Sequence, residues 1–234
     1  MNGKMQKGFS LVELAMVLFI VSLLLGGLLV PLSSQLEARK RNDALEQLER
    51  IKDALIGFAV INGRLPCFTS EQDPTSTYYG VEDSENPGKG STCSPASQTT
   101  DGILPWKTLG LASGMDPWGI ARTSSTDPWT GYWRYRVDSK FFSSFKLTDS
   151  PTDDLTVVDA DGNPMTSSSE YPVVIIYSTG ANQTADGENA SYEQAASNNP
   201  KYEGGPVSGD FDDITGWISR PLLFSRMVTA GTLP

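Results

Sequence analysis

The sequence predicts an α+β protein in which one long N-terminal helix is followed by an antiparallel β-sheet head with long loops. Three observations predict this fold. An uncharged apolar run covers residues 14–36, an amphipathic pattern of helical period continues it, and short alternating segments separated by Gly, Pro, Ser and Thr come after. The 234 residues leave room for one domain of ordinary size with an appendage.

The composition excludes several classes of protein. The formal net charge is −10, so the chain lacks the basic surface with which nucleic-acid-binding proteins neutralise phosphates. Histidine is absent, which removes Ser-His-Asp and Cys-His catalysis, and two cysteines are too few for a zinc site of cysteine alone. If the protein were an enzyme, only catalysis by carboxylates would remain possible. Neighbouring pairs such as Asp212 and Asp213 point in opposite directions on a strand, so no enzyme is predicted.

The apolar run begins the predicted helix. Residues 14–36 are 23 positions without a charge, and about 20 apolar residues suffice to span a bilayer as a helix. We therefore expect a single membrane-spanning segment. A cleaved secretory signal is the alternative, but its apolar region is only about 7–15 residues long and ends at a small-residue cleavage site. Basic residues stand on both sides of the run, so charge counting leaves its orientation open.

A short basic leader and one acidic residue precede the run. Lys7-Gly8-Phe9 is followed, after three residues, by Glu13 at the start of the apolar segment. A carboxylate one turn into a membrane segment costs roughly 2.5 kcal/mol or more. Glu13 is therefore expected either to lie at the level of the lipid headgroups or to have a partner.

Residues 7–13 resemble the class III signal of type IV pilins and type II secretion pseudopilins. The resemblance implies that prepilin peptidase cuts between Gly8 and Phe9 and methylates the new N-terminus of Phe9. It also implies that Glu13 pairs with the N-terminal ammonium of a neighbouring subunit during assembly. This pairing is physically reasonable, because each of the two charges is costly when it is alone in a medium of low dielectric constant.

An amphipathic pattern continues the helix beyond the apolar run. Apolar residues recur at steps of three and four from Leu45 to Phe58, and Asn62-Gly63 ends the helix. Together with the resemblance to pilins, this implies a pilin-like division of the chain. The segments are a leader (1–8), a membrane-spanning and assembly half of the helix (9–36), an amphipathic half (37–63) and a globular head (64–234).

A long loop opens the predicted head. Residues 69–101 are rich in Ser, Thr, Asp, Gly and Pro and have no period; Cys67 precedes them and Cys93 lies within them. Because the leader implies an extracytoplasmic head, we expect a disulfide between Cys67 and Cys93. A bridge over a loop of this size is worth roughly 3–4 kcal/mol. Two unpaired buried thiols are the alternative.

Two Asp-Pro-Trp turns and several strands follow the loop. The second turn leads into an alternating strand at residues 132–137. Aromatic side chains at strand ends commonly anchor the packing, and sugar binding by Trp118, Trp129 and Trp133 is the alternative. Further strands are expected at 155–158, 173–177 and 214–218.

A second irregular stretch, from Ser178 to Asp213, ends in a segment rich in glycine and carboxylates. Asp210, Asp212 and Asp213 suit a hard cation, which takes six to eight oxygen ligands. Major pseudopilins of type II secretion carry calcium in a loop late in the sheet region, so the resemblance implies calcium here, although no EF-hand spacing is present. A solvated acidic loop is the alternative.

The resemblance implies a type IV pilin-like structural subunit that is assembled into a pilus or a type II secretion pseudopilus. The expected partners are prepilin peptidase, other pilin or pseudopilin subunits and the inner-membrane assembly platform, with no nucleic acid. The chain would cross the bacterial inner membrane once, with its head in the periplasm, before it joins a filament that reaches toward the cell surface. The alternative is a minor pilin whose head is a membrane-tethered binding or adhesion module.

Overall fold

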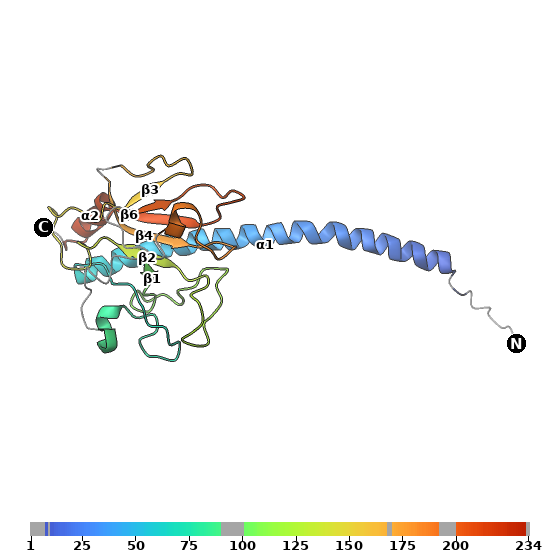
Figure 1. Ribbon diagram of the computed structural model, residues 1–234, viewed down its shortest axis with the longest axis horizontal. Coiled ribbons are helices and arrows are strands. Elements are labelled where there is room, and N and C mark those ends of the chain that lie inside the picture. Colours follow the sequence, from blue (N-terminus) through green and yellow to red (C-terminus); the bar gives the residue numbers. More distant parts are fainter. Residues whose placement is uncertain (1–7, 9, 90–100, 168–169, 192–199, 233–234) are drawn as a thin grey trace. The chain divides into compact units, whose positions relative to one another are not determined.

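The computed structural model describes residues 8, 10–89, 101–167, 170–191 and 200–232 (Figure 1). The chain consists of two compact units, Met1–Asn42 and Asp43–Pro234. The fold is α+β, with an N-terminal helix and an antiparallel sheet, as the sequence predicts.

Helix α1 extends from Leu11 to Asn62. It ends where the sequence predicts, because Gly63 has a φ of 66° and its N–H donates to the carbonyl of Ala59 at 2.8 Å. This is the left-handed C-terminal cap that glycine favours. In the described part of the chain no helix is long and apolar enough to cross a membrane, so the predicted membrane-spanning first half of α1 is not supported.

Four strands form the antiparallel sheet of the second unit. They follow the order β1-β2-β4-β6, and β4 is the longest of them. The predicted strands at 132–137, 173–177 and 214–218 are confirmed with small shifts of their ends. The strands are β1 (Gly102–Ile103), β2 (Arg134–Val137), β4 (Pro172–Ser178) and β6 (Ile214–Ser219).

Side chains of β4 are buried on both faces of this sheet. Val174 and Ile176 belong to the core formed with α1, whereas Ile175 and Tyr177 belong to a smaller core beneath a second sheet. Successive side chains of a strand point to opposite faces, which explains this alternation. The second sheet is the parallel pair β3 (Thr156–Val158) and β5 (Lys201–Glu203).

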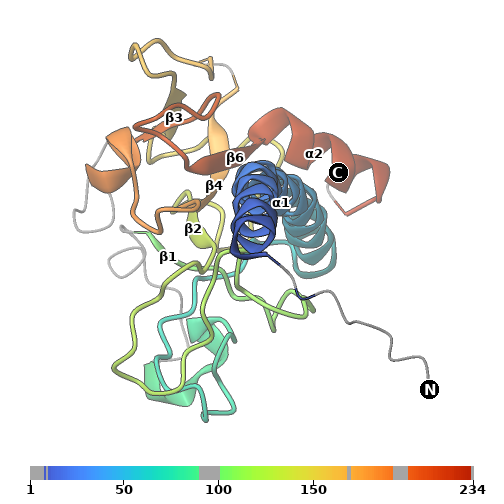
Figure 2. The ribbon, with the colours of Figure 1, turned by 90° about the vertical axis from the view of Figure 1, so that its right-hand side faces the viewer.

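The later turns of α1 pack on the sheet through one apolar stripe. The buried residues of this stripe recur at helical spacing and are Ala44, Leu48, Ile51, Leu55 and Ala59. The helix crosses β6 at Gly216, where a Cβ atom would lie 2.7 Å from Leu48 Cδ2, so the absence of a side chain permits the close approach. Helix α2 (Arg220–Thr229) continues directly from β6, as Figure 2 shows, and contributes Leu223 and Met227 to the same core.

Two buried polar contacts tie the long loop to the rest of the head. The carboxylate of Glu82 accepts hydrogen bonds from the guanidinium of Arg64 at 2.7 and 2.9 Å and from the Cys67 N–H at 2.9 Å. The hydroxyls of Tyr177 and Tyr202 donate to Asp101, the first at 2.8 Å. These contacts join the loop to the end of α1 and to both sheets.

Cys67 is buried and disulfide-bonded, and Cys93, its predicted partner, lies outside the described residues. The pairing of Cys67 with Cys93 therefore stays a prediction.

The three tryptophans considered for sugar binding pack against other side chains of the head. Trp118 and Trp133 are buried, with 8% and 1% of their surface exposed. The ring of Trp129 stacks on Tyr79 with centroids 5.7 Å apart, and the guanidinium carbon of Arg122 lies 4.1 Å from its centroid. These contacts favour the packing interpretation over the sugar-binding one.

Candidate functional site

Ser10 and Glu13 cap the start of α1 reciprocally. The Ser10 Oγ accepts a hydrogen bond from the Val12 N–H at 3.2 Å, and the Glu13 Oε2 accepts one from the Ser10 N–H at 2.9 Å. The first helical bond follows, from the Leu14 N–H to the Ser10 carbonyl at 3.1 Å. This arrangement is a capping box, in which two N–H groups that the helix leaves unpaired are satisfied by side chains.

The capping box holds the Glu13 carboxylate at the Ser10 N–H, two residues after Gly8 in the sequence. Gly8 is exposed, and Phe9 lies outside the described residues. Ser10, whose N–H donates to Glu13, follows Phe9 in the sequence. The Ser-x-x-Glu spacing of a capping box is present in the sequence, and it is the signal from which this cap could have been predicted.

The first turns of α1 expose a continuous apolar surface. Its large apolar side chains between Leu11 and Leu24 have between 43% and 86% of their surface accessible. A patch of this kind is typical of a surface that is covered by lipid or by another protein segment.

Three carboxylates meet in the head, where β4 ends and β6 begins. Oxygen atoms of Asp186, Asp212 and Asp213 lie within 4.8 Å of one another. The register of the sheet brings them together, because Ser178 at the end of β4 is paired with Ile214 at the start of β6. The loop that follows β4 and the segment that precedes β6 therefore meet at one edge.

Two of the three predicted ligands, Asp212 and Asp213, belong to this cluster. Asp210 is exposed and lies outside it. Asp186 was missed, because nothing in its local sequence relates it to a segment 26 residues later.

Backbone amides and one side-chain amide position the carboxylates. The Asp212 Oδ2 accepts the N–H groups of Ala181 and Asn182, both at 2.9 Å. The Asp213 Oδ2 accepts the Asp186 N–H at 3.0 Å and the Nδ2 of Asn189 at 2.8 Å. The second oxygen of each carboxylate, Oδ1, is buried and has no hydrogen-bond partner within the described residues.

Burial disfavours the charged form of two carboxyl groups in this cluster. Only 1% of Asp213 is exposed, and burial raises the pKa of its carboxyl to about 7. Burial also raises the pKa of Asp212, and the neighbouring Asp186 carboxylate adds to the rise. Since calcium–oxygen distances are about 2.3–2.6 Å, ligand oxygens on opposite sides of one ion lie about 5 Å apart. The spacing and the two unpaired oxygens fit a hard divalent cation, and the burial of Asp213 argues against a solvated loop.

Residues 3–29 match the family model for the prokaryotic N-terminal methylation motif. No curated protein and no solved structure matches the chain. The matched segment includes Gly8, Phe9 and Glu13, so the chain carries the N-terminal signal of type IV pilin and pseudopilin precursors. The motif implies processing by prepilin peptidase and assembly with other pilins, and it indicates a structural subunit rather than an enzyme.

Proposed function

We propose that the protein is a pilin-like structural subunit of a pilus or a type II secretion pseudopilus. Prepilin peptidase removes residues 1–8 and methylates Phe9, and the mature subunit is held in the inner membrane until it polymerises. The observation that carries this proposal is the methylation motif at residues 3–29, which runs into an exposed apolar helix. Such a helix surface is stable only when lipid or another helix covers it.

Processing tests this function. The mature chain should begin at Phe9 and lose 8 of the 234 residues, which N-terminal sequencing and the intact mass would show. Gly8→Leu should block cleavage, because the peptidase requires a small residue at the cut, whereas Gly3→Leu in the same leader should be processed normally. A mature protein that retains Met1, or that begins after residue 36, would contradict the proposal.

Glu13 is the residue that we expect to guide assembly. In the filament, the Glu13 carboxylate would give up its hydrogen bond from the Ser10 N–H and would pair instead with the Phe9 ammonium of a neighbouring subunit. Glu13→Gln separates this role from helix capping, because glutamine also serves at this position of a capping box but carries no charge. We expect the Gln variant to reach the membrane in normal amounts and to form few filaments. Wild-type filament yield with this variant would refute the pairing.

We further propose that Asp186, Asp212 and Asp213 bind calcium as a structural ion. Bound there, the cation would link the loop after β4 to the start of β6 and satisfy the two unpaired carboxylate oxygens. The buried, unpaired Oδ1 of Asp213 supports this proposal. Calorimetric titration of the Asp43–Pro234 fragment with calcium should give a saturable heat, and a titration without heat above dilution would contradict it.

A further inference from the structure

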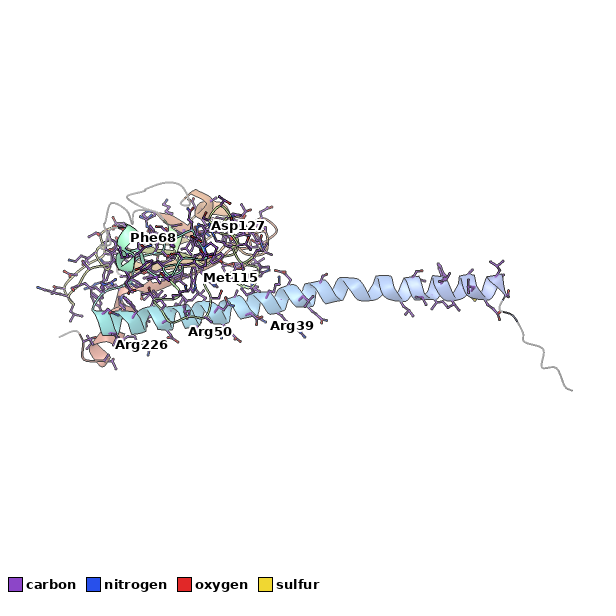
Figure 3. All side chains as sticks on the ribbon, turned by 90° about the horizontal axis from the view of Figure 1, so that it is seen from below. Arg39, Arg50, Phe68, Met115, Asp127 and Arg226 are labelled. Carbon is purple, nitrogen blue, oxygen red and sulfur yellow. The ribbon has the colours of Figure 1, made fainter. Side chains whose placement is uncertain are left out.

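A cavity of about 320 Å³ lies in the head, between the amphipathic part of α1 and the loop that precedes β2. One wall consists of Gln47, Arg50 and Ile51 of α1, and the other consists of the loop residues 110–113 and Met115. Figure 3 labels one residue of each wall, Arg50 and Met115. All of these residues belong to the second compact unit, and the proposed assembly into a filament gives the cavity no role.

Backbone hydrogen bonds hold the loop wall of the cavity in place. The Leu111 N–H donates to the Trp106 carbonyl at 2.8 Å, and the Trp133 N–H donates to the Gly114 carbonyl at 2.9 Å. Gly114 also packs against the buried ring of Trp106 so closely that a Cβ atom at this glycine would lie 2.3 Å from the ring. The wall is thus anchored at Leu111 and at Gly114, and the cavity is formed before any ligand binds, as is usual for ligand sites.

Most side chains that line the cavity are apolar. Ile51 and Trp133 are buried, with 3% and 1% of their surface exposed, and Leu111 and Met115 are half-buried. The polar atom of the Trp133 ring, Nε1, is already paired, because it donates to the Gln47 Oε1 at 3.2 Å. Methionine is flexible and makes favourable contacts with aromatic rings. The cavity therefore favours a ligand with an apolar body.

The polar side chains of the lining donate hydrogen bonds, and one of them carries a positive charge. Arg50 is exposed and takes part in no ion pair among the described residues. The Ser113 Oγ accepts the Met115 N–H at 3.0 Å, which leaves its own proton free to donate. No described Asp or Glu lines the cavity, although acidic residues outnumber basic ones by 28 to 18 in the chain. The complementary ligand group is therefore an anion that accepts hydrogen bonds.

We propose that this cavity binds a small carboxylic acid with an apolar body, such as an arylalkanoate. The carboxylate would pair with the guanidinium of Arg50, whose planar fork matches the two carboxylate oxygens, and the apolar body would contact Ile51 and Trp133. Among the described residues of the lining Arg50 is the only basic one, so a singly charged group fits better than a phosphate. Ligand cavities range from about 300 to 1,000 Å³, and this one is at the lower limit, so it admits a compact acid rather than a nucleotide or a peptide.

Titration of the full-length chain in detergent micelles with a ring-fluorinated phenylpropionate, followed by fluorine NMR, tests the proposal. Empty micelles provide the correction for partition into detergent. The wild type should bind the acid saturably, with a Kd on the order of 1 mM, and should bind the uncharged amide of the same acid at least about tenfold more weakly. Arg50→Gln should lower the affinity for the acid at least about tenfold and should remove its preference over the amide. Arg226→Gln, which removes an exposed arginine of α2, is the matched control and should bind as the wild type does.

Filling the cavity distinguishes a bound ligand from an ion pair on the open surface. Ala112→Trp adds a large ring to the lining and should abolish saturable binding of both acid and amide, whereas Ala121→Trp, at an exposed position outside the lining, should leave binding unchanged. If Ala112→Trp lowers Tm, the comparison of Arg50→Gln with Arg226→Gln decides alone. Binding by the wild type that does not saturate, equal affinity for acid and amide, binding that persists in a folded Ala112→Trp, or equal losses in the two arginine variants would each overturn the proposal. None of these measurements requires a filament, so their outcome is independent of the proposed function.

Discussion

The Asp213→Asn substitution should abolish the stabilisation of the head by calcium. A ligand that binds only the folded state adds about 2.7 kcal/mol when its concentration is a hundred times Kd. For domains of 150–250 residues each kcal/mol moves Tm by about 2–4 °C, so calcium should raise Tm by about 5–10 °C over a chelator. The structure supports a gain of this size, because leaving a buried polar group unpaired costs about 1–3 kcal/mol and the cluster contains two such oxygens.

Differential scanning calorimetry of the Asp43–Pro234 fragment provides the assay, since the core residues of the head lie within it. Asp213→Asn should melt at the same temperature with calcium and with chelator. Asp210→Asn is the matched control, because Asp210 is exposed in the same segment and should keep the full calcium effect. Magnesium should substitute poorly, because it demands a tighter octahedral set of ligands. Equal Tm values for the wild type with calcium and chelator would refute the site, as would loss of the effect in Asp210→Asn alone.

Three further predictions concern the stability of the head. Non-reducing peptide mapping should find Cys67 joined to Cys93, and a thiol at either position that reacts in the native protein would contradict the bridge. Glu82→Gln removes the charge partner of a half-buried arginine and should lower the free energy of unfolding by about 3 kcal/mol in urea titrations, whereas Glu85→Gln on the exposed side of the same turn should change it by less than about 0.5 kcal/mol. Burial raises the pKa of Asp101 from 3.8 to about 6, so its contribution to stability is complete below about pH 4 and is lost as the pH rises through 6. The buried Asp213, whose pKa is raised to about 7, titrates in the same window, so the two chains are compared: between about pH 4 and 6, Asp101→Asn should lose up to about 3 kcal/mol less than the wild type, and an unchanged pH profile in the variant would show that another group is responsible.

Local patterns were enough to predict the N-terminal signal, the end of α1 and the strands β2, β4 and β6. Each of these features depends only on residues that are neighbours in the sequence. The motif is contiguous, the helix end depends on the conformational freedom of Gly63, and the strands depend on runs of apolar and alternating side chains. Helix α2 was missed although Pro221 stands at its first turn, a position where proline is common. Its ten residues are shorter than the window of about 11–18 residues in which a helical period is recognised.

Tertiary structure alone decided the parts that depend on distant partners. β1 has two residues and β5 has three, so their existence as strands depends on the strands beside them rather than on their own sequence, whereas the strand predicted at 155–158 is confirmed as β3. The acidic cluster also depends on residues that are distant in the sequence. Asp186 reaches Asp212 and Asp213 only because antiparallel pairing sets the end of β4 beside the start of β6. The sequence by itself determined the long helix α1, most of the longer strands and the signal, since those follow from the chemistry of adjacent residues. Which carboxylates share a site was decided by the sheet register, because hydrogen bonding between strands, and not proximity along the chain, sets those distances.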